Sequence, residues 1–577
     1  MDKKLFQELK TINTDNIAWT LAEKIRGTED SADIQLRSYA IAYVLYHAET
    51  DSKVCLDNSE SFFDTATITD NIKKILNRYL PKEWDAVKTL YRKYTDKELL
   101  AYLLFNNGSE DAKVPYCSTP EGISKLACAL LNVQEGNEVL DLCSGKGNFL
   151  VEAYSEQNGF NYTGVELNFN CNDIAQIRAD LVQENITLNL CDALEYRKPN
   201  KADRIFANYP FAIKTPAMAE FKETIKNALD IPAEALHRAS SDWVFNASIV
   251  EQLKSDGKAV AIMTNGATWN STDKMIRQFF IENGYIETVI SLPAKLFTGF
   301  NVAVTLIVFS FGNSEIKMID ASEIYTKERR INTLSDENIA EILSLLDVSG
   351  EKSIVKKITD FADDEFVLNA TRYLEVLPEI KNGVELNTVA KSITRGAQIK
   401  ADDLESLKSH KPTDCRFLAL SNIVDGIISF GEEQYLTEIP SNMKKFLVKN
   451  NSIILTRTGM PEFRSAVAQV SADTEILATG NFFIIELDET KADPFYLQAF
   501  LASETGTALL KSICSGSNLL MISIDKLNKM VIPLPPIEEQ KEIGCKYAAA
   551  MDETILLQRK LEKSTAKMKH IYDEGVE

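Results

Sequence analysis

Four short apolar runs between residues 138 and 207 alternate with helix-length segments, and this alternation limits the fold more than any other feature of the sequence. The runs span residues 138–142, 162–166, 187–190 and 205–207. Strands that alternate with helices form parallel sheets with crossover helices. The carboxyl ends of such strands meet at one edge, where open α/β sheets bind their ligands. We therefore expect a ligand site at this edge.

The fourth run ends in Asn208-Tyr209-Pro210-Phe211, where Pro210 prevents further ladder pairing. Asn208 Oδ1 and the Tyr209 carbonyl oxygen can accept both hydrogens of an aromatic amine, while Phe211 stacks on the ring that bears it. The nitrogen lone pair is then held out of conjugation and becomes nucleophilic. Taken alone, the four residues are better described as a strand-ending turn.

The first run leads into the segment Asp141–Asn148, which contains two glycines and precedes a helix. Glycines permit a tight turn and close backbone approach to a ligand, and a helix N-terminus offers free N–H groups. The segment is not a phosphate-binding P-loop, because no glycine lies five residues before Gly145. Glu166 ends the second run as a ribose-binding acid would, and Asp192 follows the third run, where it can accept from an adenine amino group.

Each acid alone fits a structural role, but the four strand ends in series resemble S-adenosylmethionine-dependent, amino-directed DNA methyltransferases. The similarity is strongest to the modification subunit of Type I restriction-modification systems and covers most of residues 1–380. In that family, Tyr116–Glu121 corresponds to a segment against the methionine end of the cofactor, and Asp141–Phe149 to the cofactor loop. Asn208–Phe211 corresponds to the Asn-Pro-Pro-Phe catalytic motif.

The resemblance implies S-adenosylmethionine as cofactor and assigns site residues by their place in these motifs. The implied cofactor-binding residues are Tyr116, Cys117, Ser118, Thr119, Pro120, Glu121, Asp141, Ser144, Gly145, Lys146, Gly147, Asn148, Glu166, Asp192, Ala193 and Asn208. The implied catalytic residues are Asn208, Tyr209, Pro210 and Phe211. No metal ligand is implied.

Two residues depart from the family pattern. Tyr209 stands where the family has its first proline, so the accepting carbonyl is retained on a less rigid backbone. Lys146 places a charge where the family has a small residue.

The C-terminal third is similar to half of a Type I specificity subunit. Asn451–Gly459 and Ser515–Asn518 match its recurring strand and loop patterns, and Ile532–Gln540 leads into its spacer helix. By this likeness, residues 386–531 would read bases in the major groove of DNA. Arg457, Arg464 and Lys511 are candidates for that role, although solvated surface charge also explains each of them.

Composition limits these expectations. The net charge of −21 argues against a large positive surface for nucleic acid, yet beyond Leu386 the chain carries 22 Lys and Arg against 26 Asp and Glu. The nine cysteines are scattered and far from the four histidines, so neither a zinc site nor a disulfide framework is expected. No run approaches the roughly 20 apolar residues of a membrane span, and the polar start Met1–Lys4 opens no signal peptide. A cytoplasmic protein without membrane contact is expected.

The expected fold is multidomain α/β, with five parts. These are a helical N-terminal domain (1–110), a Rossmann-like methyltransferase domain (111–312), a helical connector (313–385), an α+β target-recognition domain (386–531) and a long spacer helix (532–577). Within the second part, the pair 286–291 and 303–310 is expected to form a terminal hairpin.

The expected function is methylation of adenine N6 in a specific double-stranded DNA sequence, with the target base flipped out of the duplex. Phe211 would stack on that base, together with Tyr209. A cytosine-C5 mechanism is not expected, because it needs a cysteine nucleophile, usually after proline, and the sequence has no Pro-Cys pair. Cytosine-N4 methylation, an inactive DNA-binding scaffold, and an RNA or protein-glutamine methyltransferase remain as alternatives. The likeness also implies restriction or defence subunits as partners and a homodimer through residues 537–572.

Overall fold

The computed structural model describes residues 3–574, apart from residues 26–30, 108–117, 183–184, 212, 214–216, 299–300, 330, 375–379, 432–433, 460–461, 472 and 515–519. The chain divides into two compact units, Met1–Leu374 (unit 1) and Glu375–Glu577 (unit 2). None of the described helices has both the length and the apolar character that a membrane crossing requires.

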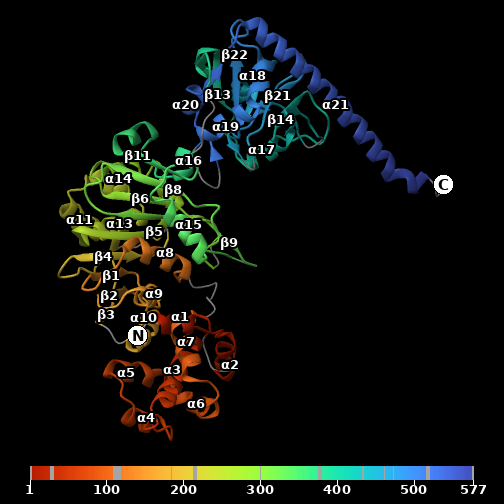
Figure 1. Ribbon diagram of the computed structural model, residues 1–577. Coiled ribbons are helices and arrows are strands. Elements are labelled where there is room, and N and C mark those ends of the chain that lie inside the picture. The colour runs from red at the N-terminus through yellow and green to blue at the C-terminus, as the bar shows by residue number, and fades with distance from the viewer. Residues whose placement is uncertain are drawn as a thin grey trace. The chain divides into compact units, whose positions relative to one another are not determined.

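The first part of unit 1 is helical, as predicted (Figure 1). Its last helix shows why the sequence folds this way: Thr95 and Glu98 form a capping box, and every residue from Leu99 to Leu104 is buried. The helices are α1 (Lys3–Lys10), α2 (Asp15–Ile25), α3 (Ser31–Thr50), α4 (Ser59–Thr65), α5 (Asp70–Tyr79), α6 (Trp84–Leu90) and α7 (Asp96–Phe105).

A mixed sheet forms the rest of unit 1, with the order β11-β8-β6-β7-β5-β4-β1-β2-β3. The strands β1 to β5 pair in parallel where they are neighbours, and β7 runs antiparallel between β5 and β6. The strands are β1 (Glu138–Leu142), β2 (Asn161–Glu166), β3 (Ile186–Leu190), β4 (Ala202–Ala207), β5 (Leu253–Thr264), β6 (Ile286–Ser291), β7 (Val304–Phe309), β8 (Glu315–Asp320) and β11 (Ser353–Lys357).

Helices cover both faces of this sheet and bury a separate core on each. One core contains residues of α8 (Glu121–Leu131), α9 (Asn148–Glu156) and α10 (Phe169–Val182). The opposite core contains residues of α11 (Ala217–Leu229), α12 (Ala233–Arg238), α13 (Ser241–Gln252) and α14 (Lys274–Glu282). This is the doubly wound arrangement that the alternating pattern predicts.

The helical N-terminal part shares the first of these cores. Buried residues of α1 to α7 are continuous with those of α8, α9 and α10. Ion pairs reinforce the contact: Lys10 Nζ lies 2.8 Å from Glu152 Oε1, and Arg78 Nη2 lies 3.1 Å from Asp173 Oδ1. The N-terminal helices are therefore fixed to the sheet domain within one compact unit.

The prediction of a helical connector at 313–385 is wrong where β8 and β11 lie, although the segment also contains helices α15 (Asp336–Ser344) and α16 (Ala370–Leu374). Strand β8 pairs in parallel with β6, and β11 pairs with β8, so both extend the sheet beyond the pair β6–β7, which is therefore not terminal. The charged residues Glu315 and Lys317 alternate with buried Ile316 and Met318, which is the period of a strand with one covered face. The remaining strands are β9 (Thr326–Lys327) and β10 (Asn332–Thr333).

Unit 2 is built from short strands and helices around its own cores. A four-stranded sheet has the order β13-β22-β18-β20, and a three-stranded sheet the order β17-β14-β21. The strands are β12 (Gly383–Glu385), β13 (Ala390–Arg395), β14 (Cys415–Leu418), β15 (Ile423–Val424), β16 (Ile427–Ile428), β17 (Tyr435–Leu436), β18 (Ile453–Thr456), β19 (Thr458–Gly459), β20 (Ser465–Val467), β21 (Glu475–Ala478), β22 (Phe482–Leu487), β23 (Leu520–Met521) and β24 (Val531–Pro533). The helices are α17 (Ala401–Leu407), α18 (Pro494–Leu501), α19 (Glu504–Ser512), α20 (Ile524–Asn528) and α21 (Ile537–Glu574).

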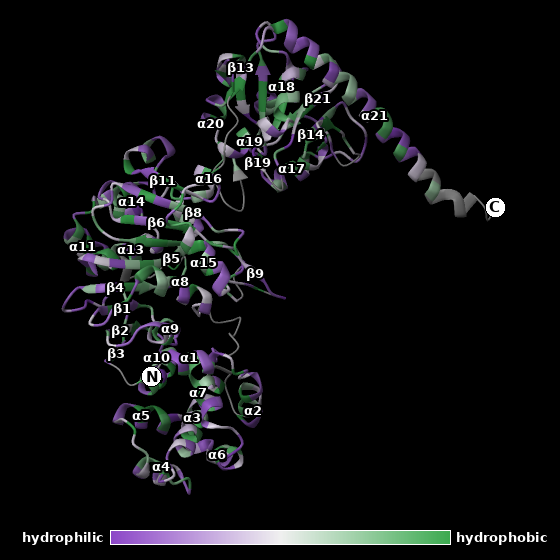
Figure 2. Cartoon of the chain, in the orientation of Figure 1, coloured by the Kyte–Doolittle hydropathy of each residue, from purple (hydrophilic) through white to green (hydrophobic). Residues whose placement is uncertain are grey.

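The long C-terminal helix predicted at 537–572 is confirmed as α21. Its start is anchored by Gln540, which is 1% exposed: its Oε1 accepts from Asp493 N at 3.0 Å and its Nε2 donates to Pro535 O at 2.8 Å. The first half packs on α18, where Met551 is buried. Further along, hydrophobic and hydrophilic residues alternate on a helix that extends away from the rest of unit 2 (Figure 2).

Candidate active site at the carboxyl edge of the sheet

The sheet brings the four predicted strand ends together. Strand β1 lies between β2 and β4, β3 lies beyond β2, and all of these pairs are parallel. The carboxyl ends of β1, β2, β3 and β4 and the residues after them therefore form one edge of the sheet. This edge contains the segment Asp141–Asn148, called the glycine loop below, together with Glu166, Asp192 and Asn208. It is called the cofactor edge below, after its predicted ligand.

Asn208 is tied to the segment that precedes α8. Its Nδ2 donates to Thr119 Oγ1 at 2.9 Å, and the residue is 7% exposed. This bond fixes the amide with its nitrogen toward Thr119 and its oxygen on the other side. The bond joins two residues that lie 89 positions apart in the chain.

Tyr209 has a structural side chain. Its ring is 1% exposed and stacks on Phe245 with centroids 4.8 Å apart, and its hydroxyl donates to Asn246 Oδ1 at 2.9 Å. The prediction that this ring stacks on a flipped base is therefore wrong, because the ring lies in the core on the α13 side of the sheet. The same contacts anchor the residue whose backbone carries the Tyr209 carbonyl.

Phe211 lies beside the segment that follows β6. Its ring meets that of Phe297 edge to face, with centroids 5.6 Å apart and planes at 88°. Phe211 is partly buried and Phe297 is 2% exposed. Phe297, which lies between β6 and β7 in the chain, thus supports the ring of Phe211 that is predicted to stack on the substrate. Pro210 lies between Tyr209 and Phe211, whose rings are both held by these contacts.

The glycine loop is closed onto Glu166. Glu166 accepts from Gly145 N at 2.8 Å and from Asn168 N at 2.6 Å, so its carboxylate is held at the end of β2. Gly145 and Gly147 have φ values of +55° and +80°, which L residues rarely adopt. A Cβ atom at Gly145 would meet nothing within 4 Å, so open space lies against this backbone.

Three carboxylates at this edge lack a positive partner. Among the described residues, none of Asp141, Glu166 and Asp192 forms an ion pair. Burial raises the pKa of Asp141 to about 7, and it also raises the pKa of Glu166. Asp141 Oδ1 and Ser144 Oγ are buried without a hydrogen-bond partner in the described structure. An open cradle with uncompensated carboxylates fits a cationic ligand such as a sulfonium cofactor.

Asn148, which is predicted to bind the cofactor, has a side chain that is bonded to protein groups. Its Nδ2 donates to Ser118 Oγ at 2.8 Å and to Thr119 O at 2.9 Å. Its Oδ1 accepts from Arg178 Nη1 at 2.7 Å. A chain of hydrogen bonds thus runs from Arg178 through Asn148 and Thr119 to Asn208.

Sequence reasoning missed Arg178, the fully buried arginine of α10. Its Nη2 donates to Tyr39 Oη at 2.9 Å and to Asn106 O at 3.0 Å, and its Nε donates to Leu103 O. The signal in the sequence was a charge four residues after Ile174, on the apolar face of a predicted helix.

Lys146 points away from the cofactor edge. Its Nζ donates to Gln35 Oε1 at 2.8 Å and to Asn107 O at 2.9 Å, which belong to the helical N-terminal part. These contacts use the side chain of Lys146, so the predicted role of this residue at the cofactor stays a prediction for its backbone. The charge that departs from the family pattern serves to attach the glycine loop to these helices.

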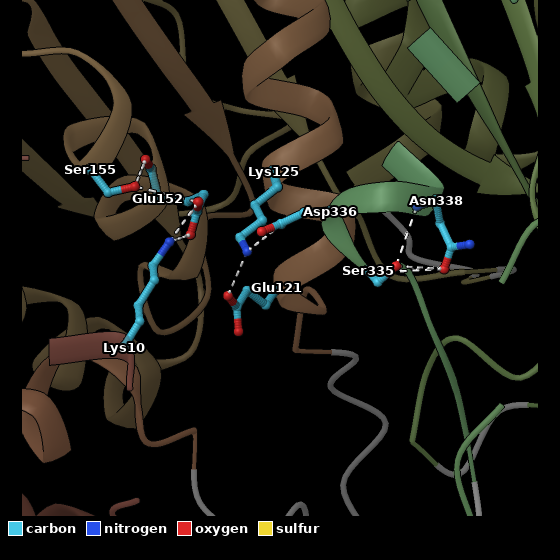
Figure 3. Close-up of polar contacts among 8 residues, drawn as sticks. All are labelled: Lys10, Glu121, Lys125, Glu152, Ser155, Ser335, Asp336 and Asn338. Carbon is cyan, nitrogen blue, oxygen red and sulfur yellow. Dashed lines mark hydrogen bonds and ion pairs between the residues drawn. The ribbon is translucent and has the colours of Figure 1, made fainter. Parts of the chain in front are cut away.

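The side chain of Glu121, like that of Lys146, contacts protein groups outside the cofactor edge. Its carboxylate pairs with Lys125, whose Nζ lies 2.8 Å from Asp336 Oδ1 (Figure 3). These residues and Lys10 line a cavity of about 890 Å³ between α1, α8, α9 and α15. Because Lys10 and Lys125 are both paired with carboxylates (Figure 3), this cavity holds little uncompensated charge.

Of the remaining predicted residues, the structure describes Asp192, Ala193 and Pro120. Asp192 Oδ1 accepts from Leu194 N at 2.8 Å, which fixes the turn after β3, and Ala193 is buried beside it. Pro120 precedes α8 as its N-cap. Tyr116 and Cys117 lie outside the described residues. Leu167 was missed: it follows Glu166 directly and is 68% exposed, an apolar side chain at a polar edge.

Comparison with known proteins gives two family matches in one chain. Residues 98–381 match the N-6 DNA Methylase family, and residues 384–563 match the Type I restriction modification DNA specificity domain. Together the two matches run through most of both units.

Two curated relatives of this chain come from Methanocaldococcus jannaschii. The Type I restriction enzyme MjaVIII methylase subunit is 26% identical over 307 residues, which cover 48% of this chain and 52% of the relative. The MjaVII methylase subunit is 26% identical over 304 residues, which cover 46% and 50%. The chain thus spans about half the length of the curated relatives it matches.

A crystal structure of a type I restriction-modification system methyltransferase subunit from Streptococcus thermophilus is 17% identical, with a TM-score of 0.48, over 63% of this chain and 98% of that one. By its two family matches, the chain combines a member of the N-6 DNA methylase family, at residues 98–381, with a member of the Type I DNA specificity domain family, at residues 384–563.

Proposed function

We propose that this protein is a site-specific DNA methyltransferase that transfers a methyl group from S-adenosylmethionine to adenine N6 within a restriction-modification system. The observation that carries the proposal is the bond between Asn208 and Thr119, which assembles the predicted catalytic amide at the carboxyl edge of an N-6 DNA methylase sheet. The relatives named as Type I methylase subunits support the same assignment.

The cofactor would lie against the glycine loop. Glu166 would accept from ribose hydroxyls with the lone pairs that Gly145 N and Asn168 N leave unused, and Asp192 would accept from the adenine amino group. The exposed Leu167 would pack on the apolar face of the adenine ring. When bound, S-adenosylmethionine supplies an activated methyl group on a positively charged sulfur. The uncompensated carboxylates of this edge favour that charge.

The residues after β4 would hold the target base. The Asn208 amide oxygen and the Tyr209 carbonyl would accept the two N6 hydrogens, and Phe211 would stack on the ring with Phe297 behind it. The catalytic contribution is positional, because the nucleophile and the methyl carbon must meet in line. The leaving group is neutral, so no strong base is needed, and the displaced N6 proton passes to water.

Unit 2 would supply DNA sequence recognition, as its specificity-domain match indicates. The protein would then act on double-stranded DNA together with further subunits of a restriction-modification complex. A second copy of the chain is proposed to pair through α21. Along its outer half, Leu557, Leu561 and Met568 are 56%, 67% and 69% exposed at spacings of four and seven residues.

The catalytic proposal is tested with Asn208→Ala in the full chain. Purified protein is incubated with radiolabelled S-adenosylmethionine and plasmid DNA, and the modified base is identified by nuclease digestion and mass spectrometry. Wild-type protein should form N6-methyladenine, and Asn208→Ala should lower the rate about 100-fold or more, with cofactor binding retained.

A matched control is Asn161→Ala. Asn161 starts β2 at the opposite edge of the sheet, where its Nδ2 donates to Glu138 Oε1, so activity should be kept. Formation of N4-methylcytosine would redirect the proposal to cytosine. Cofactor binding without any transfer by the wild type would leave a DNA-binding scaffold.

The dimer proposal is tested by analytical ultracentrifugation. Leu557→Asp with Leu561→Asp should convert a dimer to a monomer, while the exposed neighbour Lys560→Ala should not. A wild type that sediments as a monomer at all concentrations, with and without DNA, would contradict this part of the proposal.

A further inference from the structure

Strand register in unit 2 gathers three arginines at one end of the four-stranded sheet. Arg395 is the last residue of β13 and pairs with Phe483 near the start of β22. Arg457 follows the last residue of β18, which pairs with Phe482. Arg464 precedes β20, whose first residue, Ser465, pairs with Leu455. Arg395, Arg457 and Arg464 are called the arginine rim below.

Tight backbone contacts fix the rim. At Gly396, directly after β13, an added Cβ would lie 2.3 Å from Thr479 O. Only glycine therefore permits the chain to approach the Thr479 carbonyl this closely. Gly396 N donates to Phe482 O at 3.0 Å, and Arg457 N donates to Asn481 O at 2.8 Å. Arg395 therefore lies on a paired strand, and Arg457 and Arg464 each lie directly beside the end of another.

The guanidinium groups of the rim contact neutral acceptors. Arg395 Nε and Arg457 Nη1 both donate to Gly480 O at 3.0 Å, so the two groups lie side by side. Arg464 Nη1 donates to Leu420 O at 3.2 Å and to Ile423 O at 3.3 Å. A guanidinium carries five N–H donors, so each arginine keeps several donors beyond these bonds.

No carboxylate compensates the rim within the part of the chain that the structure describes. Ion pairs in that part include Lys449 with Glu486 at 2.8 Å, near the opposite end of the same sheet, but none involves Arg395, Arg457 or Arg464. Burial and the neighbouring charge of Arg395 lower the pKa of Arg457. Adjacent like charges without a counter-ion are unfavourable until an anion binds. In a chain with a net charge of −21, such a site is unusual.

We propose that the arginine rim is a binding site for the phosphate backbone of double-stranded DNA. Phosphates fit better than a base edge, because one guanine takes one guanidinium, whereas adjacent phosphates can occupy several. The rim would then set the position of unit 2 on the duplex, and other side chains would read bases. The proposal rests on the proposed function only in that the partner is DNA. Lys511, the third sequence candidate, is exposed in the last turn of α19 and is not part of the rim.

The test measures DNA binding by the full chain as a function of salt. Fluorescence anisotropy is recorded with a random-sequence duplex of about three helical turns, for wild type, Arg395→Gln, Arg457→Gln and Arg464→Gln. Removal of one arginine–phosphate ion pair should reduce the slope of log affinity against log salt by about 0.9 and weaken binding several-fold. Arg395→Lys and Arg457→Lys should keep most of the slope, because the charge is kept.

Lys449→Gln is the matched control, since it removes a positive charge that is already paired at the other end of the sheet. Its slope should equal that of the wild type. Melting temperatures of all variants show whether each variant is folded at the temperature of the binding measurement.

Three results would overturn the proposal. Folded Gln variants could keep the wild-type slope, or Lys449→Gln could lose as much slope as they do. Alternatively, the variants could bind the random duplex normally and lose affinity only for the methylated site once it is mapped, which would assign the rim to base reading. A wild type that binds no DNA would instead refute the proposed function.

Discussion

Arginines have different surroundings in the two units. In unit 1, Arg178 is fully buried and donates hydrogen bonds to oxygen atoms of six other residues. In unit 2, the half-buried Arg457 donates to one carbonyl oxygen and one thioether sulfur, and Arg395 donates to one carbonyl oxygen. The donors of Arg178 are therefore all used inside the protein, where they fix the glycine loop against the N-terminal helices. The arginines of the rim keep donors beyond the bonds that they form within unit 2. The same side chain thus positions a site in one unit and is proposed to bind a ligand in the other.

A second contrast concerns uncompensated charge. The cofactor edge of unit 1 has carboxylates without positive partners, and the rim of unit 2 has guanidinium groups without negative ones, within the described residues. Each imbalance matches the charge of the ligand that we propose for it. Unpaired charge that is held in place by backbone contacts is more informative about ligands here than net charge, which is −21 for the chain as a whole.

The largest effect is expected from Arg178→Met. It leaves six oxygen acceptors in the core without their donor, so the free energy of unfolding of unit 1 should fall by about 3–5 kcal/mol. Arg457→Gln should change the stability of unit 2 by less than about 1 kcal/mol. Chemical denaturation followed by circular dichroism measures both. Equal losses of stability for the two variants would remove the distinction between a positioning and a binding arginine.

Arg277→Met is the matched control for that comparison. Arg277 is 1% exposed and donates to Phe366 O, Ala267 O and Asn270 O, but it does not contact the chain of bonds that leads to Asn208. It should destabilise unit 1 to a similar degree, while only the Arg178 variant, assayed where it is folded, should also impair methyl transfer.

Asn148→Ala should act on catalysis more than on cofactor binding. It removes the bonds to Ser118 and Thr119, so Asn208 loses its fixed orientation, and kcat should fall about 10- to 100-fold. Single-turnover kinetics and calorimetric titration with S-adenosylmethionine separate the two effects. A large loss of cofactor affinity with unchanged kcat would instead support Asn148 as a cofactor ligand.

Tyr209→Phe should have a smaller effect. The ring stacking on Phe245 is kept, but Asn246 Oδ1 loses its hydrogen bond, which should cost about 1–2 kcal/mol of stability. Methyl transfer should remain within about tenfold of the wild type, because the carbonyl is unaltered. Abolished activity at full cofactor binding would mean that the hydroxyl has a role beyond the core.

The smallest effect is expected from pH. The raised pKa of Asp141, about 7, means that the free protein holds a proton there below that pH, and a cationic cofactor favours the ionised form. Cofactor affinity should therefore fall as pH decreases below about 7, by at most about tenfold per unit. Calorimetry in buffers of different ionisation enthalpy should detect proton release at a pH slightly below that pKa, and Asp141→Asn should abolish it. Release that persists in Asp141→Asn would assign it to another group, such as Glu166.

The local sequence pattern was sufficient to predict much of the secondary structure of unit 1. Apolar runs bounded by glycine and acidic residues predicted β1 to β4, and the motif Asn208–Phe211 was placed correctly at a strand end. The connector was misread because Glu315 and Lys317 gave a charged appearance to a strand whose buried residues alternate with them. The site roles of Thr119, Asn208 and Phe211 stay predictions that the structure makes testable.

The sequence by itself determined the alternation of β1 to β4 with helices, the long helix α21 and the family motifs, because these depend on residues close together in the chain. Only the tertiary structure decided that Tyr209 faces the core, that Lys146 and Glu121 leave the cofactor edge, and that Arg178 joins residues up to 139 positions away to Asn148. It also decided that Arg395, Arg457 and Arg464 share one sheet end. Side-chain direction and long-range partners follow from how strands register and helices pack, and no local pattern encodes that geometry.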